Sequence, residues 1–423
     1  MDICSTPGLM PIDDALANML KSITPVTCTV EKLLSDSVGY VLAQDLHSPL
    51  NVPPFDNSAM DGYAVRIADL SNTTTLEVVG KSFAGIPYKG EWPPASCIRI
   101  MTGAKIPAGC DAVIMQEQAT IDATTPNIVD FSQALPVRDQ QNIRSLGEDI
   151  GQSDLVLPKG HRLTPRDIPM IASLGIPSLT VLNKPKVAFF STGDELKPLG
   201  TPLQEGEIYD SNRYGIKIML EQFGCEAIDL GVIPDDKDQL RQAFIQAQQQ
   251  ADVVITSGGV SVGEADYTKI ILEELGQIGF WKIAMKPGKP FAFGKLLATD
   301  DSSDAIFCGL PGNPVSAILT LYILVQPLLA KLAGHADWKA QPSIPAKALT
   351  GFKKAPGRTD FQRGIYTINE QGQFEVSSTG NQSSGAFRSM SLANCFIILE
   401  RERGKVEAGE TVYIQQFAPV FYA

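Results

Sequence analysis

The sequence predicts a multidomain α/β protein in which one doubly wound α/β unit is combined with smaller β-rich domains. From about residue 185 to 333, short apolar runs alternate with segments of helical periodicity, and the runs end in polar, glycine-rich loops. Repeated alternation of this kind builds parallel sheets with right-handed crossovers. From about 48 to 150, and again over 334–423, short apolar runs are broken by Pro and Gly, which is typical of small β domains or barrels.

The composition narrows the class of protein. The chain has 423 residues, of which 44% are hydrophobic and 19% charged, as in soluble globular proteins of roughly two to four domains. A net charge of −12 argues against non-specific nucleic-acid binding, which requires Lys and Arg to neutralise phosphates. Seven scattered cysteines without a CxxC motif fit reduced cytoplasmic thiols better than disulfides or a zinc ribbon. Three widely separated histidines argue against a His-rich metal site or a Ser/Cys–His pair.

Neither the N-terminal segment nor the most apolar stretch of the chain suggests an association with a membrane. The start, MDICSTPGLMPIDDA, lacks the basic and apolar regions of a signal peptide. The most apolar stretch, AILTLYILV at 317–325, is about half the ~20 residues that a spanning helix needs. We expect a buried helix that stops at Gln326-Pro327, and a cytoplasmic protein without membrane contact.

The elements can be assigned in chain order. Residues 10–21 have helical periodicity, and residues 160–180 form a helix and a strand that lead into the α/β unit. In that unit the helix at 210–224 has candidate caps at 210–212 and a closing Gly224. Strands that end in polar loops are expected at 185–196, 226–236 and 252–266, and a second helix at 238–250. Two further segments that carry polar loops follow at 281–294 and 305–317.

The segment 252–266, DVVITSGGVSVGEAD, is the most informative of these. An apolar run of strand character is followed by hydroxyl groups, glycines and two carboxylates, Glu264 and Asp266. Open α/β sheets bind ligands at the carboxyl ends of their strands. Glycines let backbone N–H groups approach an anion closely, and the carboxylates add metal-binding or acid–base capacity. We therefore favour a functional loop over a simple turn here.

Five such loops should meet at one edge of the sheet. They are 192–195, 234–236, 258–266, 286–290 and 310–314. Carboxylates from separate loops suit Mg²⁺, lysines suit a phosphate or another tetrahedral oxyanion, and Gly312-Asn313 precedes a helix N-terminus that favours an anion. Taken singly, TGDEL, KPGKP and PGNP could each be an ordinary turn, but five together are poorly explained by coincidence.

Three dense polar segments lie outside this unit, at 53–64, 99–103 and 142–149. Each could be a tight turn that satisfies its own backbone. Their residues alone do not indicate a function.

At this point the motifs match a known family. The chain resembles the molybdopterin molybdenumtransferases, the MoeA-type enzymes whose domain also forms the C-terminal part of gephyrin. The matching segments occur in family order over nearly the whole chain: PPFDNSAMDGYAVR, RIMTGAKIP, NIRSLGEDI, STGDEL, GEIYDSN, SGGVSVGEADY, KPGKPFAFG and GLPGNPVSA.

The resemblance implies four domains and an elongated homodimer. A molybdopterin-binding α/β domain would comprise 1–28 and 185–333, and a connecting domain 29–47 and 154–184. A β-barrel-like domain would span 48–153, and a C-terminal β-barrel 334–423. The active cleft would be shared between subunits.

The implied activity is the last step of molybdenum cofactor synthesis, in which adenylylated molybdopterin and molybdate give molybdenum cofactor, AMP and water. In this scheme Mg²⁺ would be held by Glu195, Asp235 and Asp266. The other catalytic positions would be Asp61, Thr102, Arg144, Asp149, Lys282 and Lys286, with the first four facing the partner's Gly258 loop. Substrate would be bound by Ser257, Gly258, Gly259, Ser261, Lys289, Pro311, Gly312, Asn313, Ser316, Arg363 and Ser384, of which Ser261, Lys289, Ser316, Arg363 and Ser384 would hold molybdate together with Lys286.

Two other classes compete with this interpretation. A stand-alone molybdopterin adenylyltransferase has the same α/β fold, but the additional domains and the SGGVSVGEADY loop argue against it. The second class is a non-catalytic scaffold of the gephyrin type. The intact set of carboxylates and lysines argues against lost chemistry.

Overall fold

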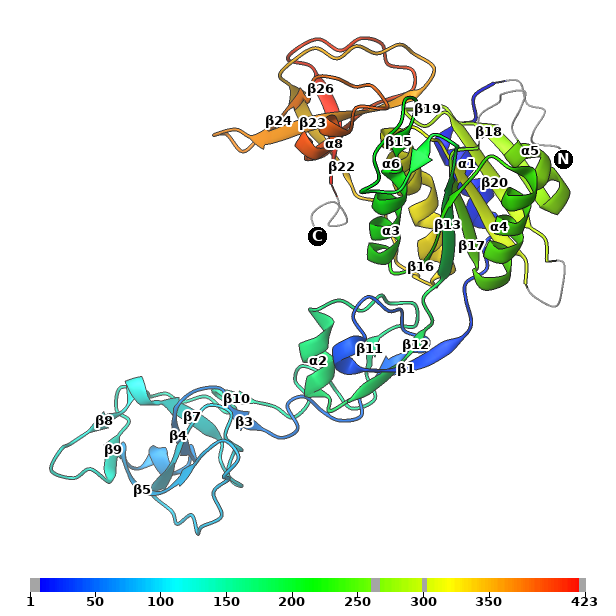
Figure 1. Ribbon diagram of the computed structural model, residues 1–423. Helices are drawn as coiled ribbons and strands as arrows, with labels where there is room; N and C mark the ends of the chain where they lie inside the picture. The colour runs from blue at the N-terminus through cyan, green and yellow to red at the C-terminus, as the bar shows by residue number, and fades with distance from the viewer. Residues whose placement is uncertain (1–7, 260–266, 299–302, 418–423) are drawn as a thin grey trace.

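The computed structural model describes residues 8–259, 267–298 and 303–417 and shows an elongated, multidomain α/β protein (Figure 1). A large α/β body carries a closed five-stranded barrel on one side, and a slender connecting region leads from the body to a separate half-barrel sheet. The predicted fold class is therefore confirmed.

The α/β body is built on a six-stranded sheet of order β16-β13-β17-β21-β20-β18. Its first four strands are parallel, and the last two are antiparallel to their neighbours. The bounds are β16 (Glu226–Ile233), β13 (Lys186–Thr192), β17 (Val253–Ser257), β21 (Ala305–Leu310), β20 (Pro290–Leu296) and β18 (Gly276–Lys282). The 286–290 loop thus reaches the carboxyl edge differently from our expectation. It precedes an antiparallel strand instead of following a parallel one.

Helices cover both faces of this sheet because its buried strands are apolar on both sides. Val187 and Phe189 of β13 face one core, and the alternate residues Ala188 and Phe190 face the other. The first core is closed by α1 (Ile12–Lys21), α3 (Asn212–Gln222) and the helical run 314–332, and the second by α4 (Lys237–Gln250) and α5 (Tyr267–Leu275).

The apolar helix is longer than the sequence suggested. It continues from α6 (Pro314–Thr320) through a π-helical turn (Leu321–Val325) into α7 (Gln326–Leu332). Pro327 lies in the first turn of α7, and the π turn before it takes up the change in hydrogen-bonding pattern, so the proline does not end the helix. Among the described residues this 19-residue run alone has the length and apolarity of a membrane span, but 72% of it is buried within the protein, as expected for a core helix.

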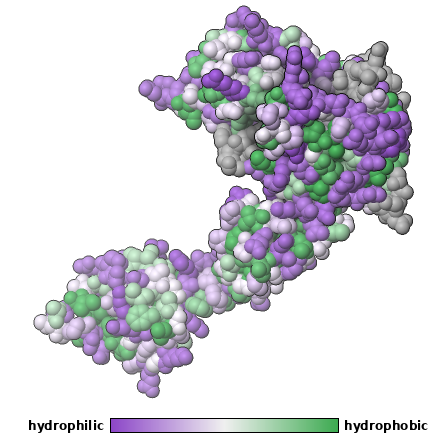
Figure 2. All heavy atoms as spheres, in the orientation of Figure 1, coloured by the Kyte–Doolittle hydropathy of each residue, from purple (hydrophilic) through white to green (hydrophobic). Residues whose placement is uncertain are grey.

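The connecting region is crossed twice by the chain. It contains β1 (Thr29–Leu33) paired with β12 (Ser178–Leu182), β2 (Leu46–His47) paired with β11 (Leu155–Leu157), a 3-10 turn (Leu34–Asp36) and α2 (Asp167–Ser173). A small core of its own includes Leu42, Leu163 and Ile171. It is the narrowest part of the molecule, with polar and apolar side chains mixed on the visible face (Figure 2).

The half-barrel is an open sheet of order β7-β4-β6-β5-β9-β8. Gly62 must be glycine, because a Cβ there would lie 1.9 Å from the carbonyl oxygen of Ile114. The bounds are β7 (Ala112–Met115), β4 (Gly62–Val65), β6 (Ser96–Ile100), β5 (Thr75–Ser82), β9 (Ile128–Asp130) and β8 (Thr120–Ile121), with a β3 (Asn57–Ser58) to β10 (Ile143–Arg144) pair and 3-10 turns at Asp69–Ser71 and Gln116–Gln118.

The C-terminal sheet closes on itself, since β23 pairs with both β24 and β25. Its strands are β22 (Ser343–Ala348), β23 (Thr359–Ile368), β24 (Phe374–Ser378), β25 (Cys395–Leu399) and β26 (Thr411–Gln416), with α8 (Phe387–Leu392) beside them. The short β19 (Met285–Lys286) of the α/β body pairs with β23, and Phe361 and Phe396 of the barrel share a core with Tyr322 of the long helix. The barrel is therefore packed firmly against the body.

Candidate active site

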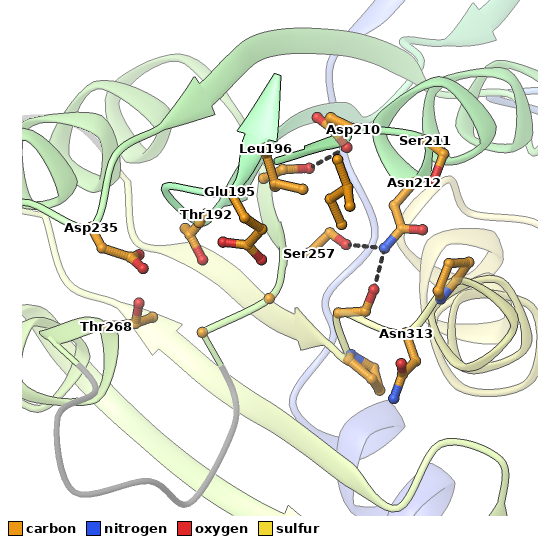
Figure 3. Close-up of a pocket in the computed structure, with 18 of the residues that line it drawn as sticks. Thr192, Glu195, Leu196, Asp210, Ser211, Asn212, Asp235, Ser257, Thr268 and Asn313 are labelled. Carbon is orange, nitrogen blue, oxygen red and sulfur yellow. Dashed lines mark hydrogen bonds between the residues drawn. The ribbon is translucent and has the colours of Figure 1, made fainter. Parts of the chain in front are cut away.

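A cavity of about 1040 Å³ lies at the carboxyl edge of the parallel strands (Figure 3). The ends of β13, β17 and β21 and the start of α3 form its floor and walls, together with the short pair β14 (Leu196–Lys197) and β15 (Ile208–Tyr209). Of the predicted residues, the cavity is lined by Glu195, Asp235, Ser257, Gly258, Gly259, Lys282, Lys289, Pro311, Gly312 and Asn313.

The glycines after β17 are required by local geometry. Gly258 has φ +99° and Gly259 φ +65°, in the region that residues with a Cβ rarely adopt. A Cβ on Gly258 would lie 2.9 Å from the carbonyl oxygen of Thr192, and one on Gly259 would lie 2.5 Å from the Thr268 hydroxyl. The backbone of this loop therefore passes close to its neighbours, and no side chain of these two residues obstructs the cavity.

Asn212 joins two of the strand ends. Its Nδ2 donates to Ser257 Oγ at 2.9 Å and to the carbonyl of Gly312 at 2.7 Å (Figure 3). The Asn212 side chain is buried, and its Oδ1 has no hydrogen-bond partner. The sequence marked Asn212 only as a candidate helix cap. In the structure the cap position is Ser211, which makes no side-chain capping bond, and Asn212 fixes the position of the Ser257–Gly259 loop relative to the Pro311–Asn313 loop.

Asp210 is a second residue of the cavity that sequence reasoning did not assign to the site. It is 2% exposed and accepts hydrogen bonds from Ser191 Oγ at 3.1 Å and from the Arg213 side chain at 3.0 Å. Arg213 also donates to Asp229 at 2.8 Å. The signal for both missed residues was the GEIYDSN motif, but nothing in its spacing shows which side chains face the cavity.

Two carboxylates reach the cavity from separate loops. Glu195 follows β13 and Asp235 follows β16, and their carboxyl groups point toward the same part of the cavity (Figure 3). Over residues 8–259, 267–298 and 303–417 no cluster of three or more His, Cys, Asp or Glu side chains is formed. The third predicted metal ligand, Asp266, and the predicted oxyanion ligand Ser261 lie outside the described residues.

The three predicted lysines are divided between two positions. Lys282 and Lys289 line the cavity, at the end of β18 and directly before β20. Lys286 does not line it. Its Nζ lies 3.2 Å from Oδ2 of Asp360, a buried carboxylate of the C-terminal barrel.

The remaining predicted oxyanion ligands of the α/β body and barrel are held in structural contacts. Arg363 is 1% exposed and donates to Ser389 Oγ and to the carbonyls of Asn381 and Ser383. Ser316 is buried in α6, and Ser384 accepts through its backbone carbonyl from the N–H of Val315 at 3.0 Å. They lie around the junction of body and barrel, not in the cavity lining.

The predicted residues of the half-barrel lie far from the cavity of the same chain (Figure 1). Thr102 donates its backbone N–H and its hydroxyl to Asp61 Oδ1, both at 2.7 Å, and these bonds lower the pKa of Asp61. Arg144 and Asp149 are exposed on the nearby 142–149 segment. The structure thus brings Asp61 and Thr102 into contact but does not place this group in the cavity of its own chain.

An open α/β sheet with a large cavity at its carboxyl edge is typical of a small-ligand-binding protein. Family models match the chain in order: the MoeA N-terminal region (domain I and II) at residues 10–175, a probable molybdopterin binding domain at 188–331, and the MoeA C-terminal region (domain IV) at 345–417. The chain belongs to the molybdopterin molybdenumtransferases, enzymes of molybdenum cofactor biosynthesis.

Individual relatives support this assignment over the full length. A molybdopterin molybdenumtransferase of Haemophilus influenzae is 55% identical over 97% of this chain and 99% of its own. Gephyrin of Dictyostelium discoideum is 31% identical over 98% of this chain and 63% of its own. Among solved structures, a molybdopterin biosynthesis moeA protein of Pyrococcus horikoshii superposes with a TM-score of 0.81 at 29% identity, covering 97% of this chain and all of that one.

Proposed function

We propose that the enzyme transfers molybdenum from molybdate to adenylylated molybdopterin in a Mg²⁺-dependent reaction that releases AMP. The observation that carries the proposal is the cavity itself, in which carboxylates, lysines and glycine-loop amides converge at the edge where α/β sheets bind nucleotide-like ligands. A cytoplasmic location is part of the proposal, because the described cysteines form no disulfide.

Glu195 and Asp235 fit a divalent cation, since Mg²⁺ prefers carboxylate oxygens and keeps water or phosphate oxygens in its remaining positions. Asp266 would complete the set. When bound, Mg²⁺ neutralises charge on a phosphoanhydride as it breaks. The two described carboxylates would hold the cation at the end of the cavity near Thr268.

The cations of the site fit the anionic parts of the substrates. Lys282 and Lys289 lie where they can contact the pterin phosphate and the oxyanion, and the amides of Gly258, Gly259 and Gly312 offer further donors. Lys286 precedes the Pro287-Gly288 turn that leads to Lys289, and it is the further lysine that we assign to molybdate.

The half-barrel group, Asp61 with Thr102, Arg144 and Asp149, is assigned to the cavity of a second subunit. Three of these residues are exposed and Asp61 is partly buried, and the connecting region holds the group away from the body of its own chain. In a symmetric homodimer each half-barrel can reach the partner's cavity, so the active site would be composite.

The test is to incubate the protein with adenylylated molybdopterin, molybdate and Mg²⁺ and to measure AMP and the molybdenum bound to the pterin. The proposal is supported if AMP release requires Mg²⁺ and is accompanied by molybdenum bound to the pterin. If the protein instead releases pyrophosphate in a parallel incubation with ATP and molybdopterin, it is an adenylyltransferase. If it binds molybdopterin without turnover under all these conditions, the scaffold alternative holds.

A further inference from the structure

Lys286 already has an anionic partner within the protein, so its ammonium group is not free for a substrate anion. The side chain is 46% exposed, yet its Nζ is bonded to Asp360 Oδ2, whose side chain is only 5% exposed. Register places Lys286 opposite Asp360 in the parallel pairing of β19 and β23, so the contact is built into the strand pairing between the body and the barrel.

Asp360 is held in place independently of Lys286. Nε2 of Gln362 donates to the same Oδ2 at 3.2 Å and also to the carbonyl of Lys353 at 2.9 Å. The carboxylate therefore cannot swing away freely, whereas the half-exposed lysine can move on its flexible stem.

The other cations around Asp360 are committed to neutral acceptors. Lys354 donates to the carbonyls of Ala355, Arg358 and Arg401 at 2.8–3.3 Å. Arg363 is fixed by Ser389 Oγ and two carbonyls. Of these three cations only Lys286 has a direct bond to Asp360 among the described contacts, and Lys286 is the most exposed of the three, since Lys354 is partly buried and Arg363 is buried.

We propose that Asp360 is a built-in competitor for the oxyanion: it holds Lys286 in the unloaded enzyme, and a tetrahedral dianion must draw the lysine off it in order to bind. The inference rests on the proposed assignment of molybdate to Lys286. A dianion and a carboxylate that share one ammonium group repel each other at short range, so Asp360 weakens oxyanion binding and favours its release. Adventitious dianions such as sulfate are kept out of the site by the same repulsion.

The main test measures molybdate dependence in Asp360→Asn, which keeps the size and an acceptor for Lys286 and Gln362 but removes the charge. We expect the half-saturating molybdate concentration to fall by about tenfold, and inhibition by sulfate to strengthen by a similar factor, as short-range charge repulsion of this kind implies. Asp360→Ala should change both in the same direction. Asp69→Asn is the matched control, because it removes a partly buried ion-paired aspartate (Arg66 Nε at 2.8 Å) of the distant half-barrel and should leave both unchanged.

The outcomes separate the inference from the assignment on which it rests. If Lys286→Gln raises the half-saturating molybdate concentration but Asp360→Asn leaves it unchanged or raises it, molybdate binds at Lys286 and the competitor role is wrong. If neither variant alters it, molybdate binds elsewhere and both statements are wrong.

A measurement on the wild-type protein guards against variants that fold poorly. A crystal structure with saturating molybdate or sulfate should show Lys286 Nζ on the anion and beyond hydrogen-bond distance of Asp360. An anion bound at Lys286 while the Lys286–Asp360 bond persists would contradict displacement.

Discussion

At the scale of single residues, the site is defined as much by buried supports as by the groups that would touch substrate. Nothing in the sequence pattern around Asn212 and Asp210 assigns them to the site, yet each fixes part of the cavity wall. Hydrogen bonds from a buried amide to two separate strand ends are worth little each in net stability, but leaving their partners unsatisfied is costly.

We predict that Asn212→Ala weakens molybdopterin binding more than it weakens the fold. The Ser257–Gly259 and Pro311–Asn313 loops would lose their common anchor, and stability should fall by about 1–3 kcal/mol as a buried carbonyl and hydroxyl lose a donor. Ligand titration and thermal unfolding measure the two effects. Asn72→Ala, an exposed position of the half-barrel, is the control. Unchanged ligand affinity in a destabilised Asn212 variant would reduce Asn212 to a structural residue.

We predict that Gly258→Ala loses ligand binding, whereas Gly109→Ala does not. Both glycines have positive φ, +99° and +83°, so both variants should carry a strain cost of about 1 kcal/mol. Only at Gly258 would the new Cβ also meet backbone, the carbonyl oxygen of Thr192 at 2.9 Å, because nothing lies within 4 Å of it at Gly109. Equal effects of the two substitutions on binding would show that the close approach at Gly258 has no role.

Sequence reasoning reached the residues whose place follows from the strand order and missed those whose place depends on side-chain direction. Glu195, Asp235 and Gly258 line the cavity because they follow parallel strands directly, which periodicity and turn chemistry predict. The direction of Asn212 depends on how α3 packs against β13, β16 and α6, and the burial of the Asp360 partner of Lys286 depends on a strand pairing between two domains. Neither can be derived from one sequence.

At the scale of elements, hydrogen-bonding detail decides where helices begin and end. The expected stop at Pro327 failed because tertiary packing favours a continuous helix in the core, where Leu324, Leu328 and their neighbours are fully buried. In α2 the start is fixed instead by Asp167, which accepts from the N–H and the hydroxyl of Thr164, both at 2.7 Å, and contacts His161.

A pH-dependent contribution to stability follows from this arrangement. Burial alone would raise the pKa of Asp167, but the hydrogen bonds from the Thr164 hydroxyl, His161 and the Thr164 amide outweigh it and lower the pKa. A lowered carboxyl pKa stabilises the fold above the unfolded value of about 4, and the contribution is lost as pH falls through the lower folded value.

We therefore expect Asp167→Asn to lower the unfolding temperature at pH 7 and to lower it progressively less as the pH is taken below about 4. Differential scanning calorimetry of both proteins across this range measures the effect. A difference that stays constant with pH would mean that the carboxylate charge does not stabilise α2.

At the scale of the whole molecule, the arrangement of the domains is what the sequence could least specify. The alternating and broken apolar patterns predicted an α/β unit and β-rich units, and the structure confirms them. That the C-terminal sheet closes while the other stays open, and that the half-barrel is carried away from the cavity on a slender connection, depend on long-range pairings that leave no local pattern.

A composite site makes a specific prediction for mixed dimers. Asp61→Ala and Glu195→Ala should each be nearly inactive alone. In a mixed dimer one cleft collects both substitutions and the other neither, so co-refolding should restore up to about half of the wild-type activity per mixed dimer. Differently tagged chains that co-purify show that mixed dimers form. If they form while activity stays at the level of the single variants, the cleft is not shared.

The two passages of the chain through the connecting region meet side by side, since the N–H of Ser48 donates to the carbonyl of Asp154 at 2.9 Å. Everything between these residues is thus an insertion whose two ends nearly touch, and it has its own apolar cores. Such a cassette can be exchanged, resized or grafted without rerouting the rest of the chain. Evolution, or an engineer, can therefore alter the surface of the half-barrel while leaving the ligand-binding body intact.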